Sequence, residues 1–258
     1  MENKQPLLSL CIPIYNRLES LKRMLERFLE DKILFEEIID LLISDNCSTD
    51  DLESCVNEFR SKGLKITYNR NQKNLGPDGN FLYCFNHAKG KYCWLLGSDD
   101  IPVRGFLSSL VTILQGKEYG LVHLNHHSDE LPQLLKYSDN QKMVEDIAHW
   151  ITFMSSNIIN SKYISFINSN QYLDTFLIQV PYYLYSCLNS PVNAMYKYSC
   201  FEKDDDSANN GSYNLFQVFV QNLFDVYDRF SQQKMLSRKV IEKIKRNEYE
   251  HFLFPFIK

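Results

Sequence analysis

Hydrophobic residues in the first half of the chain form short continuous runs, separated by stretches with helical spacing. Four of these runs predict buried β-strands, at Leu7–Ile14, Ile38–Ser44, Leu64–Tyr68 and Lys91–Leu96. Between them, apolar residues recur every three or four positions and predict helices over Arg17–Leu29, from Ser48–Asp51 to about Ser61, and from Pro77 to Gly90. Alternating strands and helices are typical of parallel βαβ units, so we expect an α/β fold.

The second half of the chain has a weaker pattern. Tyr119–Leu124 predicts a strand, whereas the polar stretch Asn125–Gln141 predicts a loop or insertion. Tyr172–Leu188 is continuously apolar and aromatic, and its length favours a helix. Two amphipathic helices are expected over Tyr213–Arg229 and Met235–Phe252. We therefore expect one domain with two halves, residues 1–124 and 125–212, and a C-terminal helical extension, residues 213–258.

Composition narrows the class of protein only slightly. The 258 residues are 44% hydrophobic, which is enough for one sizeable α/β core. A net charge of −4, without a basic stripe, argues against a nucleic-acid partner. The seven cysteines form no C-x-x-C pair, and no apolar leader precedes the first strand, so we expect reduced, mostly buried thiols in a cytoplasmic protein. No apolar run reaches the roughly 18 residues of a membrane-spanning helix.

Polar side chains follow three of the predicted strands where each strand ends. These clusters are Tyr15–Arg17, Ser44–Asn46 and Ser98–Asp100, and a fourth, Asn74–Asn80, opens the helix after the third strand. Ligands of open parallel sheets bind beyond the carboxyl ends of the strands, so we expect the four clusters to share one rim. A single acidic turn would fit a helix cap, but four clusters together favour a binding site.

The absence of two common motifs narrows the chemical class of the ligand. There is no G-x-x-x-x-G-K-[ST] loop and no G-x-G-x-x-G after the first strand. A phosphate ligand held beside acids instead needs a divalent cation, and Mg²⁺ or Mn²⁺ takes carboxylate and phosphate oxygens. Because successive side chains point to opposite sides, we assign Asp100 to the metal and Asp99 to ribose hydroxyls or to the metal's surroundings.

Three segments carry a resemblance to a known family. LSLCIPIYNR, LLISDNCSTD and NRNQKNLGPDGNFLYCFNHAKGKYCWLLGSDD, in this order and spacing, resemble the nucleotide-sugar half of family 2 glycosyltransferases, nearest to the abequosyltransferase-like enzymes of O-antigen and capsule assembly. The resemblance covers about Leu7–Leu114, and FMSSNIIN at Phe153–Asn160 also resembles this subgroup. It implies a Rossmann-like GT-A fold with a mixed central sheet and a helical C-terminal portion. Residues 1–124 would bind the nucleotide-sugar and residues 125–212 the acceptor.

The resemblance also implies roles for residues around the nucleoside. Pro13, Tyr15 and Arg17 would frame the nucleoside pocket, with the Tyr15 ring near the base. Asp45 and Asn46 would hydrogen-bond the base edge. Because Asn both donates and accepts, the donor could be a UDP-, GDP- or CDP-sugar.

Further residues are implied around the diphosphate. The diphosphate or donor-sugar side would be lined by Asn74, Gly76 and Asn80. Gly97 stands where many relatives carry another Asp, which leaves Asp99 and Asp100 for the metal.

The implied reaction is an inverting transfer to a glycan acceptor carried by a membrane lipid. Mg²⁺ or Mn²⁺ would offset charge on the leaving diphosphate, and a carboxylate would take the acceptor's proton. Asp174 is the candidate base, with a simple helix cap as the equal alternative, and Asp146 and Glu145 are weaker candidates. Two other functions stay open: a sugar nucleotidyltransferase, and a glycan- or nucleotide-binding module that has lost catalysis.

Other features favour ordinary roles. His126–His127 has no third ligand at metal-site spacing, and Asp204–Asp206 fits a solvated loop. The basic C-terminal helix fits a solvated face or a contact with anionic lipids. The apolar end Phe252–Ile257 predicts packing on the body, contact with a partner copy, or peripheral contact with the inner face of the cytoplasmic membrane.

Overall fold

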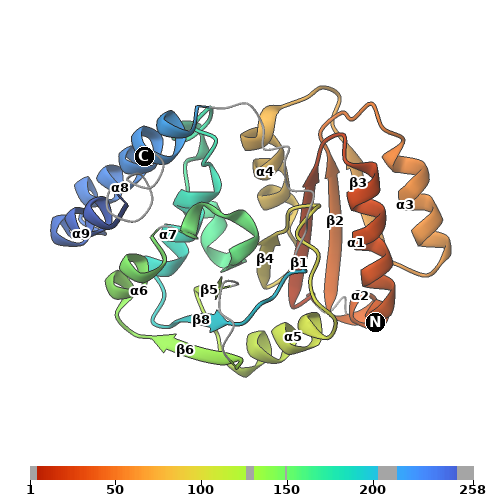
Figure 1. The fold of residues 1–258 in the computed structure, drawn as a ribbon, viewed down its shortest axis with the longest axis horizontal. Coiled ribbons are helices and arrows are strands. Elements are labelled where there is room, and N and C mark those ends of the chain that lie inside the picture. The colour runs from red at the N-terminus through yellow and green to blue at the C-terminus, as the bar shows by residue number, and fades with distance from the viewer. Residues whose placement is uncertain (1–4, 126–130, 149, 203–213, 249–258) are drawn as a thin grey trace.

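The computed structural model describes residues 5–125, 131–148, 150–202 and 214–248 (Figure 1). The predictions for His126–His127, Asp204–Asp206 and Phe252–Ile257 lie outside these ranges.

A mixed β-sheet runs through the described part of the chain, with its eight strands in the order β3-β2-β1-β4-β7-β5-β8-β6 (Figure 1). The strands are β1 (Leu8–Ile14), β2 (Ile39–Asp45), β3 (Ile66–Arg70), β4 (Tyr92–Leu95), β5 (Leu121–Asn125), β6 (Gln133–Tyr137), β7 (Asn157–Asn160) and β8 (Asn193–Lys197). The first four are parallel, as predicted. β7 is antiparallel to both β4 and β5, β8 is parallel to β5, and β6 closes the far edge antiparallel to β8.

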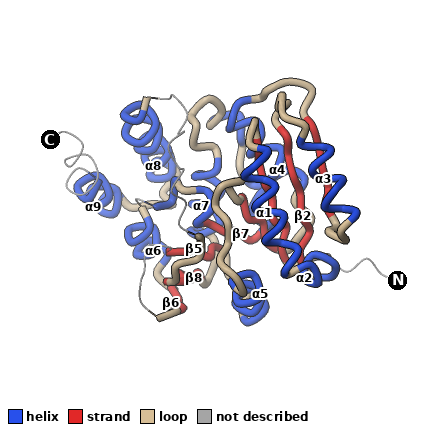
Figure 2. Tube along the Cα trace, turned by 45° about the vertical axis from the view of Figure 1, so that its right-hand side comes forward, coloured by secondary structure: helices blue, strands red, loops and turns tan. Residues whose placement is uncertain are grey.

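Helices cover both faces of this sheet. They are α1 (Leu18–Glu30), α2 (Lys32–Glu37), α3 (Leu52–Ser61), α4 (Gly76–His87), α5 (Phe106–Gly116), α6 (Asn140–Ile147), α7 (Gln179–Leu188), α8 (Leu223–Gln232) and α9 (Arg238–Glu248). A π-helical turn, η5 (Gln217–Asn222), leads into α8. Figures 1 and 2 show α1, α2 and α3 beside the β1–β3 end of the molecule, and α6, α8 and α9 at the opposite end.

The sheet separates two apolar cores because successive strand side chains point to opposite faces. Leu10 and Ile12 of β1 pack into a core shared with α1, α3 and α5. Cys11, between them, belongs to a second core shared with α4 and α6–α9. Trp94 and Leu95 of β4 divide in the same way. These layers confirm the expected α/β fold with a mixed central sheet.

Two predictions for the second half were wrong. The stretch Asn125–Gln141 contains β6, whose side chains are mostly half-exposed or exposed, so no apolar run marks it. The helix expected from Tyr172 begins only at Gln179. Asp174 lies in the preceding turn with a left-handed backbone, φ 64°. Pro181 occupies the first turn of α7, where proline is tolerated.

The cysteines and helices agree with two simpler expectations. All seven cysteines are free thiols; six are buried and Cys47 is partly exposed. Among the described residues, no helix combines the length and the apolar character needed to cross a bilayer.

Candidate active-site cleft

A cleft of about 880 Å³ opens beyond the carboxyl ends of β1, β2 and β4. Residues from all four polar clusters line it, as the parallel strand order predicts. The predicted site residues on its wall are Pro13, Tyr15, Arg17, Asn46, Asn74, Gly76, Asn80, Asp99 and Asp100. Asp45 and Asp174 are not among the lining residues.

The loops after β1 and β2 are tied together at one end of the cleft. Asn16 has a left-handed backbone with φ 52°, its N–H donates to Ser48 Oγ at 2.9 Å, and its Oδ1 accepts from Thr49 N–H at 2.7 Å. The neighbouring Tyr15 is 45% exposed, so its ring is available to a ligand at this end of the wall.

Asp45 lies beneath this wall and is fully buried. Its Oδ1 accepts from Ser48 N–H at 2.8 Å, and its Oδ2 accepts from Tyr68 Oη at 2.8 Å and Arg70 Nη1 at 3.0 Å. Burial and the hydrogen bond to this carboxylate raise the pKa of Tyr68. In this arrangement Asp45 fixes the loop after β2, and its carboxylate does not reach the cleft.

Asn46 also directs its amide to protein groups. Nδ2 donates to Asn74 Oδ1 at 2.9 Å and to Gly76 O at 3.1 Å. Oδ1 accepts from Leu75 N–H at 2.9 Å and from Asn71 Nδ2 at 3.2 Å. These four bonds use the whole capacity of an amide side chain. Asn46 therefore shapes the start of α4 rather than offering free groups to a base edge.

Asp99 and Asp100 follow β4 in a tight turn on the cleft wall. The Asp99 carboxylate forms an ion pair with Arg17, and both side chains keep nearly two-fifths of their surface exposed. Ser155, which is fully buried, donates its hydroxyl to Asp100 Oδ2 and accepts from Gly97 N–H at 2.9 Å. Ser155 lies just before β7, the strand next to β4, so this short polar chain holds Asp100 from the neighbouring strand.

Gly97 is needed for this arrangement. A Cβ atom at this position would lie 2.4 Å from Asp100 Oδ2 and 3.2 Å from Asp99 Oδ1. A side chain here would therefore displace the Asp100 carboxylate from its present position.

The acid pair fits a divalent ion that shares its coordination with a phosphate ligand. Among the described residues no group of three or more Asp, Glu, His or Cys side chains could hold a metal by itself. Mg²⁺ is commonly bound through one or two carboxylates with substrate phosphates and water completing its shell. Asp99 and Asp100 offer two carboxylates on a wall that has room for such a ligand.

None of the acids considered as bases is among the residues that line the cleft. Asp174 is exposed in the turn before α7, two residues from Phe176, which does line the cleft. Asp146 pairs with Lys142 and accepts from Tyr137 Oη at 3.1 Å. Glu145 pairs with Lys243 of α9 at 2.9 Å.

Sequence reasoning missed the residue that joins the two walls of the cleft. Asp78, at the start of α4, is 6% exposed and accepts from Phe176 N–H at 2.9 Å and Ile178 N–H at 3.3 Å. Burial raises the pKa of Asp78, and these backbone donors oppose that rise. In the sequence it resembles any acid in a first helical turn, because its partners are backbone groups about a hundred residues away.

The cleft also has apolar lining residues, and sequence reasoning did not find them either. They come from the segment before β7, from the residues before α7 and from η5: Phe153, Met154, Phe176, Leu177, Val218 and Phe219. π-Helical turns are frequent at functional sites. Gln179 adds an amide to the lining, donating from Nε2 to Thr152 O at 2.9 Å.

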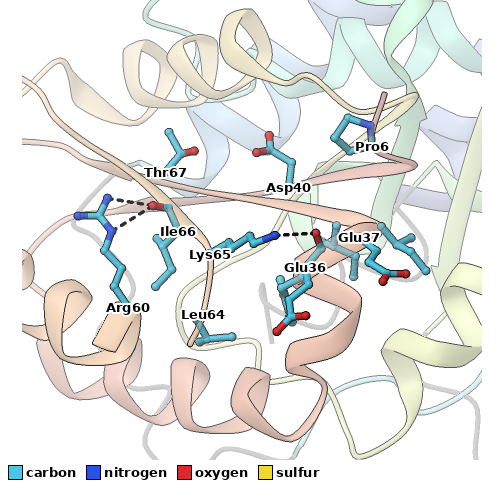
Figure 3. A pocket seen from close by; sticks show the side chains of 12 residues that line it. Pro6, Glu36, Glu37, Asp40, Arg60, Leu64, Lys65, Ile66 and Thr67 are labelled. Carbon is cyan, nitrogen blue, oxygen red and sulfur yellow. Dashed lines mark hydrogen bonds between the residues drawn. The ribbon is translucent and has the colours of Figure 1, made fainter. Parts of the chain in front are cut away.

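A second pocket, of about 470 Å³, lies at the other ends of β2 and β3 (Figure 3). Its cationic side chains bind backbone carbonyls: Arg60 donates to Ile66 O at 2.9 and 3.2 Å, and Lys65 donates to Glu36 O at 3.1 Å. It contains none of the residues from the polar clusters. We therefore place the functional site in the cleft beyond β1, β2 and β4.

Comparison with known proteins gives matches over most of the chain. A family model described as glycosyl transferase family 2 matches residues 9–245. Abequosyltransferase RfbV of Salmonella typhimurium is 42% identical over 112 residues, 43% of this chain and 33% of that protein. A GalNAc(5)-diNAcBac-PP-undecaprenol beta-1,3-glucosyltransferase of Campylobacter jejuni is 30% identical over 120 residues, 46% of this chain and 37% of that protein. The matched stretch thus spans about a third of each relative.

Solved structures share the fold. S. aureus TarS superposes with a TM-score of 0.68 at 12% identity, over 95% of this chain and 44% of TarS. Its fragment 1–349 in complex with UDP-GlcNAc gives 0.64 at 13% identity, over 95% of this chain and 73% of the fragment. The mannosyltransferase PcManGT from Pyrobaculum calidifontis, in complex with GDP-Man and Mn²⁺, gives 0.55 at 13% identity, over 96% of this chain and 76% of that one.

Proposed function

The chain belongs to glycosyl transferase family 2, and from that premise we propose that it transfers a sugar from a nucleotide-sugar to a surface-glycan acceptor. The observation that carries the proposal is the cleft beyond β1, β2 and β4, which brings Tyr15, Arg17 and the Asp99–Asp100 pair onto one wall. Two proteins of the same fold were solved with UDP-GlcNAc and with GDP-Man. A donor of this chemical class therefore fits both the family and the geometry.

On this proposal the donor spans the wall from β2 to β4. Pro13, Tyr15 and Arg17 frame the nucleoside, with the exposed Tyr15 ring beside the base. Asp45 and Asn46 keep the surrounding loops in place. Asn74, Gly76 and Asn80 line the α4 side of the wall, where we place the diphosphate or the donor sugar.

Asp100, with Asp99 beside it, would hold Mg²⁺ or Mn²⁺ at the diphosphate. A bound divalent ion supplies charge that stabilises the leaving nucleoside diphosphate. Ser155 orients the Asp100 carboxylate through its hydroxyl. Arg17 pairs with Asp99 and adds a second positive charge on the same wall.

The acceptor side belongs to residues 125–212, with residues 213–258 as a helical extension. We place a glycan carried by a membrane lipid here, a proposal supported by the name of the Campylobacter relative. Asp174 is proposed as the base that takes the proton of the attacking hydroxyl, because it lies two residues before the wall segment that begins at Phe176. Attack opposite the leaving diphosphate would invert the anomeric carbon.

The donor class can be tested with a panel of UDP-, GDP- and CDP-sugars in the presence of Mn²⁺. Thermal shift identifies the donor that binds, and release of the nucleoside diphosphate then measures turnover. Pyrophosphate exchange would instead identify a sugar nucleotidyltransferase. Binding without turnover for every donor and acceptor would identify a binding module.

Replacement of the metal-binding acid tests the site itself. We expect Asp100→Ala to remove Mn²⁺-dependent turnover and Mn²⁺ binding while leaving a cooperative unfolding transition, since Asp100 is partly exposed at the cleft. Asp228→Ala is the matched control, because its surface pair with Lys245 contributes little to stability and lies away from the cleft. Normal Mn²⁺-dependent turnover in Asp100→Ala would contradict the metal assignment.

A further inference from the structure

One buried acceptor atom, in a residue that lines the cleft, has no partner among the described residues. Gln179, the first residue of α7, is 3% exposed and lines the cleft. Its Nε2 donates to Thr152 O at 2.9 Å, and this bond fixes which arm of the amide is the acceptor. Among the described residues, no group donates to Oε1. A buried acceptor without a donor costs free energy, so such atoms usually bind a water molecule or a ligand.

The order of the strands places Gln179 on one side of the acid pair. Asn46 follows β2, Asp99 and Asp100 follow β4, and Thr152 precedes β7 in a sheet that runs β2-β1-β4-β7. Gln179, bonded to Thr152, therefore lies on the β7 side of the acids, away from Asn46. If the acids mark the diphosphate, as the proposed function has it, sugar units extend toward Gln179.

The surroundings of Gln179 favour a sugar as the missing partner. The nearby wall side chains Phe176, Leu177, Val218 and Phe219 are apolar and have no hydrogen to donate. A sugar combines hydroxyl donors with apolar C–H faces that pack on aromatic rings. Such a ligand satisfies the acceptor and covers the apolar wall at the same time.

We propose that Gln179 Oε1 accepts a hydrogen bond from a hydroxyl group of a sugar bound in the cleft, on the donor or on the acceptor. The inference rests on the proposed function. A neutral amide oxygen selects and orients a hydroxyl and does not take its proton, so this role is distinct from that of the base. Oε1 exposes almost no surface in this structure, so the hydroxyl reaches it after a small shift of the surrounding side chains.

Three variants separate this role from a structural one. Gln179→Met keeps the length of the side chain and removes the acceptor, whereas Gln179→Glu keeps an acceptor. Tyr183→Phe is the structural control, because the buried Tyr183 hydroxyl donates to Met154 O at 3.2 Å in the segment that Gln179 also holds. It loosens that segment without removing Oε1.

The measurement is calorimetric binding of UDP and UDP-GlcNAc, of GDP and GDP-mannose, and of CDP and CDP-glucose, each with Mn²⁺. We expect Gln179→Met to bind the nucleoside diphosphates as the wild type does and the matching nucleotide-sugar about 10- to 100-fold more weakly. Gln179→Glu should recover most of this loss, and Tyr183→Phe should show none. This outcome assigns the hydroxyl to the donor. Unchanged donor binding with a similar rise in the KM for a lipid-linked glycan acceptor assigns it to the acceptor.

Two results would overturn the inference. In the first, Gln179→Met matches the wild type for donor and acceptor alike. In the second, Gln179→Glu and Tyr183→Phe lose as much affinity as Gln179→Met, which would mean that the residue only supports the segment at Thr152. A wild-type protein that binds none of these nucleotides would refute the proposed function first, and the inference with it.

Discussion

The missing side chain at Gly97 leaves room for the carboxylate of Asp100. A Cβ atom there would lie 2.4 Å from Asp100 Oδ2, which is the end of a side chain rather than backbone. The collision can therefore be relieved by turning Asp100 away, without moving β4. The residue type at position 97 thus determines where the carboxylate of Asp100 points.

We expect Gly97→Ala to change stability by less than about 1 kcal/mol and to weaken Mn²⁺ binding severalfold, because the carboxylate moves and the backbone stays. Urea unfolding and Mn²⁺ calorimetry measure the two effects. Gly116→Ala, at the end of α5, is the control, because a Cβ atom there meets nothing within 4 Å. Unchanged Mn²⁺ affinity in Gly97→Ala would show that Asp100 does not depend on this space.

The prediction for the acceptor side concerns Asp174, the proposed base. Asp174→Asn should leave nucleotide-sugar binding unchanged and slow transfer by about 10²–10⁴-fold, since a general base contributes about that much. Single-turnover kinetics measure the transfer rate, and calorimetry measures the binding of the nucleotide-sugar. The control is Asp225→Asn, another exposed acid, in the first turn of α8. An unchanged transfer rate in Asp174→Asn would assign the base to another residue.

At the scale of elements, α4 and the residues before α7 form the two sides of the cleft. Asp78 binds them together by accepting from Phe176 and Ile178 N–H. These two hydrogen bonds join parts of the chain that belong to different predicted halves, residues 1–124 and 125–212. This buried carboxylate therefore helps to set the width of the cleft, together with the stacked rings of Phe85 in α4 and Tyr182 in α7.

Removal of this carboxylate should affect both stability and binding. We expect Asp78→Ala to cost about 2–4 kcal/mol, because two backbone donors lose their acceptor, and to weaken nucleotide-sugar binding. Urea unfolding gives the first quantity and calorimetry the second. Asp51→Ala removes the N-cap of α3, whose side chain accepts from Ser54 N–H, and should lower stability less than Asp78→Ala does, with no change in binding. Equal binding losses in the two variants would argue against a special role for Asp78.

The elements that could be predicted are those whose burial produces a local pattern of apolar residues in the sequence. β1, β2 and β4 are buried on both faces and appear as apolar runs, so the polar clusters after them could be placed on one rim. β6 is half-exposed and gives no such run. α7 looked longer than it is because Tyr172 is buried like the helix, although Pro181 in the first turn signals where the helix starts.

The contacts within the site could not be predicted, because they join residues far apart in the chain. Ser155, before β7, reaches Asp100, after the neighbouring strand β4, and Asp78 reaches Phe176. The family resemblance places Asn46 at the base edge, but all of its hydrogen-bonding groups bind other parts of the protein. Residue type and strand order give the place of a side chain, and only the packed structure gives its partners.

At the scale of the whole molecule, the C-terminal helices are part of the second core. Leu223, Tyr227 and Phe230 of α8 and Ile244 of α9 are buried together with residues of α6 and α7. Lys243 and Lys245 of the basic α9 pair with Glu145 and Asp228. The second face of the sheet is thus covered from both halves of the chain.

We expect Phe230→Ala to lower the free energy of unfolding by about 3–5 kcal/mol, as for other large buried aromatic side chains. Urea unfolding should show a single transition for the whole protein. Phe216→Ala is the control, since this side chain is 54% exposed and should cost less than about 0.5 kcal/mol. A loss of less than about 1 kcal/mol in Phe230→Ala would mean that residues 213–258 are an appendage.

The distribution of thiols makes the molecule convenient to label. Six cysteines are buried in the two cores. Cys47 is partly exposed and directly follows Asn46 of the cleft wall. A maleimide dye applied to the native protein would attach at Cys47 well before the other six, without any substitution in the chain. A fluorophore there sits at the edge of the cleft, where its emission would report the arrival of a ligand.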